Sequence, residues 1–303
     1  MLTIYLPIAE RSVDIWALLA VGGGVGLLSG IFGVGGGFLM TPLLMFLGIT
    51  PAVAVATGAN QMLGTAVSGS IAHWRRRNVD VRMGVVLLSG GLVGAAFGVW
   101  LFALLQRQGQ IDLVIILSYL IFLGLVGALT LGEGLRAAIG SRQATTARRR
   151  HHLPWHGWPV RVRFPRSRLY VSVIPPLAVG AFGGVLAAIM GVGGGFVMVP
   201  LMIYVLGMRT SVVVGTSLFQ IVFVTTGVTL MQAVTTHTVD AVLALILLIG
   251  GAVGAQIGAR LGVRLKGDHL RILLALLVLA VAGKMAWDLI SRPDDLFSLS
   301  SGS

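Results

Sequence analysis

The chain has 303 residues, of which 56% are hydrophobic and only 11% are charged, and its mean hydropathy is +0.95. This composition offers too little polar surface to cover a water-soluble globule, so it excludes a soluble protein and predicts a polytopic membrane protein. The absence of cysteine excludes disulfides, thiol nucleophiles and thiolate metal sites.

The first residues, "MLTIYLPIAERSVDIW", lack the basic start and small-residue cleavage site of a signal peptide, so we expect no cleavage. Apolar runs then follow along the chain. Most are continuous over roughly 20 residues, which predicts transmembrane helices and not the shorter alternating strands of a barrel. The runs lie at about 16–32, 38–48, 52–73, 82–105 and 111–132, and again at about 170–190, 196–206, 211–233, 240–262 and 270–290.

The two sets of runs are copies of each other. The stretch "IFGVGGGFLMTPLL" begins at Ile31, and "IMGVGGGFVMVPLM" begins 158 residues later at Ile189. Further matches follow in the same order and include Pro, Thr, Gln and Asp, which indicates a duplication. The expected parts are an external N-terminal segment (1–15), a first transmembrane repeat (16–132), a basic cytoplasmic linker (133–169), a second transmembrane repeat (170–290) and a C-terminal tail (291–303).

Arginine is distributed oppositely in the two halves. The loop "HWRRRNVDVR" is basic where its counterpart "AVTTHTVD" has no Lys or Arg, and "RLGVRLKGDHLR" is basic where "LLQRQGQI" has a single Arg. Under the positive-inside rule, equivalent loops then lie on opposite sides of the membrane, with the Arg-rich linker inside and both termini outside. The sequence therefore predicts an all-α polytopic membrane protein of two inverted repeats, each with a broken or re-entrant helix pair at GVGGG and three full transmembrane helices.

The glycine blocks indicate where a ligand would bind. The run at 38–48 is 11 residues long and as a helix would span roughly 16 Å, about half of the membrane core. It would begin directly after the glycines, with Pro42 in its first turn. Backbone N–H groups at such a helix start lack partners and carry partial positive charge, which favours an anion. Close helix packing is the alternative role of these glycines.

Uncharged polar side chains recur beside the breaks. Thr57 and Gln61 are four residues apart, as are Thr216 and Gln220, so each pair lies on one helix face. Hydroxyls and amides can hold an anion through weak hydrogen bonds, although hydrogen bonding between helices would also explain them. The candidate substrate-binding residues are Gly35, Gly36, Gly37, Phe38, Thr57, Asn60, Gln61, Gly193, Gly194, Gly195, Phe196, Thr216, Ser217 and Gln220.

Other features favour structural roles. The four-residue glycine spacing in "GGLVGAAFG" and "GGAVGAQIG" is typical of helix packing, and Asp80 and Asp240 stand where helix N-caps are expected. The cluster "HHLPWHGW" lies in the Arg-rich linker, where contact with anionic lipid headgroups is favoured over metal binding. Ser68 and His73 are five residues apart, which is poor spacing for a catalytic nucleophile and its base, so we expect no enzyme. We also expect no cofactor and no bound metal. No acidic residue lies at mid-depth to carry a coupling proton.

The paired glycine block, each copy followed by a Thr-x-x-x-Gln helix, resembles the TauE/SafE sulfite exporter family, also called the toluene-sulfonate uptake permeases. The resemblance covers about residues 16–290. It implies alternating-access transport of sulfite, sulfoacetate or another organosulfonate across the cytoplasmic (inner) membrane, with no nucleic-acid partner, and a homo-oligomer is compatible with it. Export is favoured, because an anion leaves a negative interior downhill. An anion channel, cation-coupled sulfonate uptake and an accessory membrane protein remain open.

Overall fold

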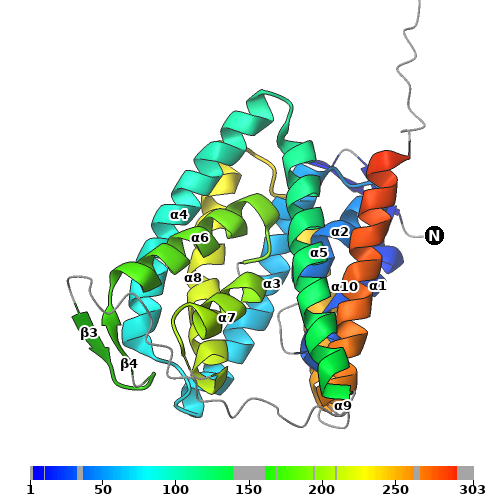
Figure 1. Ribbon diagram of the computed structural model, residues 1–303. Coiled ribbons are helices and arrows are strands. Elements are labelled where there is room, and N and C mark those ends of the chain that lie inside the picture. The colour runs from blue at the N-terminus through cyan, green and yellow to red at the C-terminus, as the bar shows by residue number, and fades with distance from the viewer. Residues whose placement is uncertain are drawn as a thin grey trace, which may run out of the picture. The chain divides into compact units, whose positions relative to one another are not determined.

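The computed structural model describes residues 3–9, 11–32, 37–138, 161–167, 169–193, 195–208, 210–262 and 267–291. Its elements follow one order twice: a hairpin, a helix, a short helix and three long helices (Figure 1). The first set is β1 (Thr3–Leu6), β2 (Arg11–Asp14), α1 (Ile15–Phe32), α2 (Gly37–Phe46), α3 (Pro51–Arg75), α4 (Val81–Arg107) and α5 (Ile111–Ala138). The second set is β3 (Arg161–Phe164), β4 (Leu169–Ser172), α6 (Ile174–Met190), α7 (Gly195–Tyr204), α8 (Thr210–Thr235), α9 (Ala241–Gly262) and α10 (Gly267–Ile290).

The helices confirm the ten predicted apolar runs, mostly to within a few residues. Five of the helices in the described residues are long and apolar enough to cross a membrane, which supports a multi-pass membrane protein. These candidate spans are Val81–Arg107, Ile111–Gly132, Val212–Thr235, Ala241–Gly258 and Ile272–Ile290. Helix α3 is 25 residues long but is not among them, because polar residues such as Asn60 and Gln61 interrupt its apolar sequence.

Two β-hairpins were not predicted. They have the same antiparallel register, since Thr3 pairs with Asp14 and Arg161 pairs with Ser172. Residues 161–164 lie in the segment that we expected to be only a basic linker, and the strand 169–172 occupies the start of the run predicted at 170–190. The same order of elements, with the hairpin first, therefore recurs in both halves of the chain.

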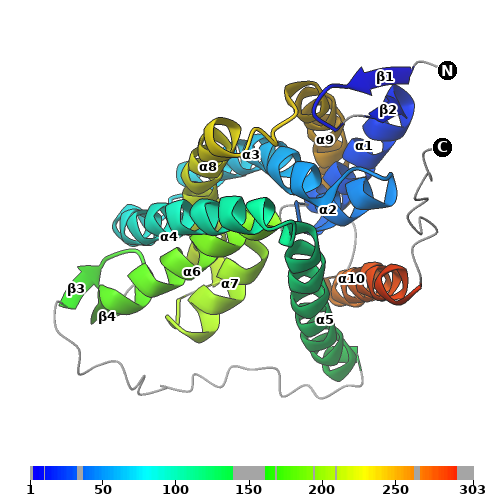
Figure 2. The same cartoon turned by 90° about the horizontal axis from the view of Figure 1, so that it is seen from above.

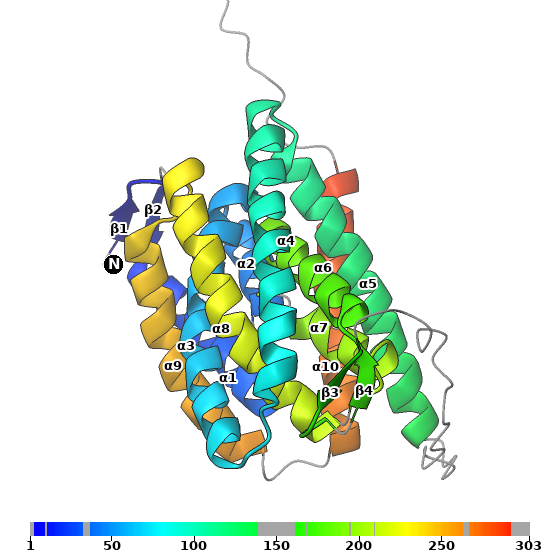
Figure 3. The ribbon, with the colours of Figure 1, turned by 90° about the vertical axis from the view of Figure 1, so that its left-hand side faces the viewer.

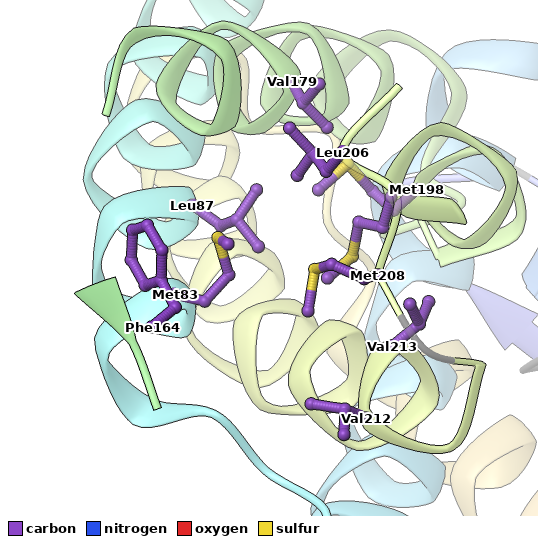
Figure 4. Packing of buried hydrophobic residues seen from close by; sticks show 10 residues of the cluster. Met83, Leu87, Phe164, Val179, Met198, Leu206, Met208, Val212 and Val213 are labelled. Carbon is purple, nitrogen blue, oxygen red and sulfur yellow. The ribbon is translucent and has the colours of Figure 1, made fainter. Parts of the chain in front are cut away.

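Each hairpin inserts one apolar side chain into the protein. Phe164 in β3 is fully buried, as is Leu6 at the same place in β1. Figure 4 shows Phe164 beside Met83 and Leu87 of α4, in a core cluster to which α6, α7 and the start of α8 also contribute. The hairpins are thus anchored by hydrophobic packing.

The described elements form two compact units. One unit contains both hairpins, α1 to α4, the first residues of α5, and α6 to α9. The other contains the remainder of α5 together with α10, and inside it Gly127 faces Val278 and Leu279. The first unit holds every candidate residue that the structure describes.

In the first unit, the closest helix pairs join the two halves of the sequence. Helix α1 packs against α9, α4 packs against α6, and α3 packs against α8 (Figure 2). The glycines of α4 and α9 allow this approach: a Cβ on Gly94 would collide with the backbone of Ala181, and one on Gly254 with the backbone of Gly23. The predicted packing role of these glycine-spaced helices is confirmed.

The two hairpins lie at opposite ends of the long helices of this unit (Figure 1, Figure 3). Hairpin β1–β2 is at the end where α9 begins, and hairpin β3–β4 is at the end where α4 begins. Each hairpin therefore meets a helix from the other half of the sequence.

Candidate functional site

The second glycine block interrupts a helix, as predicted. Helix α6 ends at Met190, and Gly191 closes it in the left-handed conformation (φ +66°), with its N–H donating to Ala187 O at 3.0 Å. Gly193 is also left-handed (φ +61°), so a side chain at either position would be strained. Helix α7 starts at Gly195. In the first half, α1 and α2 are separate helices, while Gly35, Gly36 and Gly194 lie outside the described residues.

The two short helices have ten residues each, or roughly 15 Å of helix. This confirms that neither run is long enough to cross a membrane alone. The expectation that Pro42 lies in the first turn is wrong, because the helix begins at Gly37 and Pro42 is its sixth residue. Pro200 has the same place in α7. A proline there cannot donate a hydrogen bond to the preceding turn.

The two breaks meet at one side chain. A Cβ built on Gly193 would lie 3.3 Å from the sulfur of Met62, and one on Gly37 would overlap the same sulfur. The start of α2 and the break before α7 therefore flank Met62 of α3. Phe38 is buried at the start of α2; the side chain of Phe196 lies outside the described residues.

A hydroxyl that the sequence did not indicate faces the second break. Thr225 Oγ1 would lie 3.0 Å from a Cβ on Gly193, and Thr225 is 1% exposed. This oxygen has no hydrogen-bond partner among the described residues. The repeat comparison missed Thr225 because the matching residue in the first half, Ala66, has no polar group. A search for positions where the two halves differ in polarity would have found it.

The paired threonines make mirrored contacts between the halves. The backbone N–H of Asp240 donates to Thr57 Oγ1 at 3.1 Å, and the backbone N–H of Asp80 donates to Thr216 Oγ1 at 3.1 Å. Both threonines are fully buried. In this arrangement each hydroxyl accepts a hydrogen bond and keeps its own proton to donate.

The paired glutamines also bind neighbouring helices. Gln61 Nε2 donates to Gly22 O of α1 at 3.2 Å, and Gln220 Nε2 donates to Leu87 O of α4 at 3.4 Å. Both side chains are buried, and Gln220 Oε1 has no partner among the described residues. The glutamines thus form the hydrogen bonds between helices that the sequence left open as an alternative role. Each amide still has a second N–H that it can donate to a ligand.

The two weaker candidates bond within their own helices. Asn60 Nδ2 donates to Ala56 O at 3.4 Å, and Ser217 Oγ donates to Val214 O at 3.0 Å. Neither contact joins the breaks. The described geometry therefore brings Gly37 and Gly193 together at Met62 of α3, whereas the glutamine side chains bond to α1 and α4.

Asp80 and Asp240 cap helices, as predicted. Asp80 Oδ1 accepts from Met83 N at 3.3 Å, and Asp240 Oδ1 accepts from Val242 N and Leu243 N at 3.0 Å each. Both carboxylates are buried. Each cap satisfies N–H groups that have no partner inside the helix.

The second oxygen of each carboxylate holds a hairpin, which the sequence did not indicate. Asp80 Oδ2 accepts from the backbone N–H and the hydroxyl of Ser167, at 2.8 and 2.7 Å. Asp240 Oδ2 accepts from the backbone N–H of Ile8 at 3.2 Å. Arg166 adds a 2.6 Å bond to Val79 O. The hairpin contact at Asp80 is thus stronger than its counterpart at Asp240.

Comparison with known proteins gives a consistent result. The family model described as Sulfite exporter TauE/SafE matches residues 18–285. The probable membrane transporter protein YjnA of Bacillus subtilis (strain 168) is 26% identical over 240 residues, covering 77% of this chain and 85% of that protein. A probable membrane transporter protein of Xylella fastidiosa (strain Temecula1 / ATCC 700964) is 30% identical over 202 residues, covering 66% of this chain and 67% of that protein. No solved structure matches the chain.

Proposed function

Because the chain belongs to the TauE/SafE sulfite exporter family, we propose that it is a permease for a small sulfur-containing anion, such as sulfite, sulfoacetate or another organosulfonate. The observation that carries this proposal is the approach of the two helix breaks to the Met62 side chain. Two short helices start there, and helix starts attract anions through unpaired N–H groups and the helix dipole. The proposed membrane is the cytoplasmic (inner) membrane.

The proposed anion site lies at the starts of α2 and α7. Gly37, Phe38, Gly193 and Gly195 contribute backbone there, and the side chains of Gln61 and Gln220 approach along α3 and α8. Each glutamine is anchored by one amide N–H to a helix carbonyl and offers the other to the anion. Uncharged donors suit a transporter, because they bind an anion without holding it permanently.

Asn60, Thr57, Thr216 and Ser217 complete the proposed set. Thr57 and Thr216 act through the helices that they join. Their hydroxyl oxygens accept hydrogen bonds from the backbone N–H groups of Asp240 and Asp80, the capping residues of α9 and α4. Anion binding near α3 and α8 would in this way affect the contacts at the starts of α9 and α4, at both ends of the first unit.

We further propose that the repeats are inverted and work by alternating access. The Arg asymmetry of the loops and the location of the hairpins at opposite ends of the unit support this arrangement. Each hairpin binds a capping Asp of the other half. The two contacts are therefore suited to close the transport path on the two sides of the membrane alternately. With the basic loop at residues 75–82 inside, the Asp80 contact closes the cytoplasmic side and the Asp240 contact closes the outer side.

Export is the proposed direction. An anion that leaves a negative interior gains about 2.3 kcal/mol per charge at 100 mV, so no coupled cation is needed.

A ligand panel tests the proposed function. Sulfite, sulfate, thiosulfate, sulfoacetate, taurine and chloride would each be added to the purified protein in detergent, and the thermal unfolding midpoint would be measured. An anion at about 100 times its Kd adds about 2.7 kcal/mol of stability. We expect sulfite or an organosulfonate to raise the midpoint more than chloride does. Equal midpoints with every anion and with none would contradict the proposal.

A further inference from the structure

One face of α8 carries polar groups that the described protein does not satisfy. Thr225 Oγ1, Thr229 Oγ1 and Gln232 Oε1 are buried side-chain oxygens without a hydrogen-bond partner among the described residues. Their spacing of four and three residues places them on the same side of the helix. Buried polar atoms in native proteins are nearly always paired, so this face needs water or a ligand.

This face begins at the second helix break. Thr225 Oγ1 would lie 3.0 Å from a Cβ on Gly193, two residues before the first residue of α7. Farther along, Gln232 Nε2 donates to Ala188 O near the end of α6 at 2.9 Å, which fixes the orientation of the amide. The unpartnered hydroxyl of Thr225 is therefore directed at backbone that the start of a ten-residue helix makes electropositive.

The matching face of α3 differs at the position of Thr225. The residues at the matching positions, 159 residues earlier, are Ala66, Ser70 and His73. Ala66 is 2% exposed, and its side chain is only a methyl group. At this position of the long helix the two halves therefore differ, with a hydroxyl in α8 and a methyl group in α3.

We infer that the anion is held asymmetrically, at the second break, where Thr225 donates its hydroxyl to the anion opposite the backbone of Gly193 and the start of α7. This inference rests on the proposed function and names the residue and the half that bind the anion. A hydroxyl and backbone N–H groups are hydrogen-bond donors, so the ligand is a small anion, and its class, an oxyanion of sulfur, is that of the proposed function. Thr229 and Gln232 continue the polar face toward the end of α8, where they contact the water that accompanies the anion.

Four variants of the purified full chain test the inference with sodium sulfite as the probe. Thr225→Val keeps the shape and removes the hydroxyl, and Thr225→Ser keeps the hydroxyl. Thr226→Val is the matched control, because Thr226 Oγ1 already donates to Val222 O of its own helix at 2.7 Å. Thr225→Ala pairs with Thr225→Ser in case valine prevents folding, since these two differ only in the hydroxyl.

We expect Thr225→Val and Thr225→Ala to raise the Kd for sulfite by about tenfold or more, because a hydrogen bond to a charged group is lost. Thr225→Ser and Thr226→Val should stay within about threefold of the wild type. Equal Kd values for Thr225→Ser and Thr225→Ala, beside a wild type that binds sulfite, would overturn the inference. A wild type that binds none of the anions would instead overturn the proposed function.

Discussion

Replacing Asp80 with asparagine tests the contact between hairpin β3–β4 and the start of α4. Asparagine can keep an oxygen against Met83 N–H, but its amide group then faces Ser167, where Oδ2 accepts two hydrogen bonds. The serine hydroxyl can turn and accept, whereas the backbone N–H of Ser167 cannot. A buried donor without an acceptor costs about 1–3 kcal/mol, and the lost bond involved a charged group. We expect the variant to lose about 3 kcal/mol of stability.

Asp240→Asn is the matched comparison. Its Oδ1 accepts both cap N–H groups of α9, which an asparagine oxygen can also do. Its Oδ2 accepts only the N–H of Ile8, at 3.2 Å, and Ile8 itself is 38% exposed. We therefore expect this variant to lose only about 1 kcal/mol.

The assay is equilibrium unfolding of the purified protein in mixed micelles, followed by tryptophan fluorescence during titration with SDS. Asp14→Asn serves as the control: Asp14 Oδ1 accepts an exposed hydrogen bond from Trp16 N at 3.0 Å, which an asparagine oxygen can also accept, so the change should cost less than about 0.5 kcal/mol. In a double-mutant cycle, Ser167→Ala should cost less in the Asp80→Asn background than in the wild type. Equal losses for Asp80→Asn and Asp240→Asn, or additive effects with Ser167→Ala, would refute the reasoning.

Three further predictions follow from the geometry. Gln61→Ala and Gln220→Ala should each weaken anion binding by about 1–2 kcal/mol in calorimetric titrations, and wild-type affinity in both would remove the amides from the site. Gly94→Ala should destabilise the protein by about 1–3 kcal/mol by collision with the α6 backbone, whereas Gly124→Ala, which has open space around it, should be neutral in the same unfolding assay. A single cysteine at Ser141, in a chain without cysteine, should resist impermeant thiol reagents in whole cells, and labelling there would contradict the inside location of the linker.

The sequence was sufficient to predict the helix breaks and the elements around them. Glycine disfavours a helix, and the run after each glycine block is too short to span a membrane, so both conclusions depend only on local sequence. The glycine spacing in α4 and α9 similarly predicted close packing, which Gly94 and Gly254 confirm. Periodicity and composition are local signals, and they identified these features correctly.

The missed features depend on contacts between distant residues. Each hairpin has only four-residue strands, and it contacts distant residues through buried apolar side chains and through a carboxylate in the other half, such as Asp80 for Ser167. The Arg-rich sequence 161–168 therefore resembled a solvated linker. Thr225 was missed for a different reason: the search favoured residues that recur in both halves, and its counterpart Ala66 is apolar.

Flux in proteoliposomes tests the central proposal most directly. The protein would be reconstituted in liposomes loaded with radiolabelled sulfite, and a potassium diffusion potential, negative inside, would be imposed with valinomycin. The proposed mechanism predicts loss of label from liposomes that contain the protein, faster with the potential than without it and saturable in sulfite. A flux that the potential does not change would contradict electrogenic export, and the absence of any protein-dependent sulfite flux would contradict the proposed transport itself.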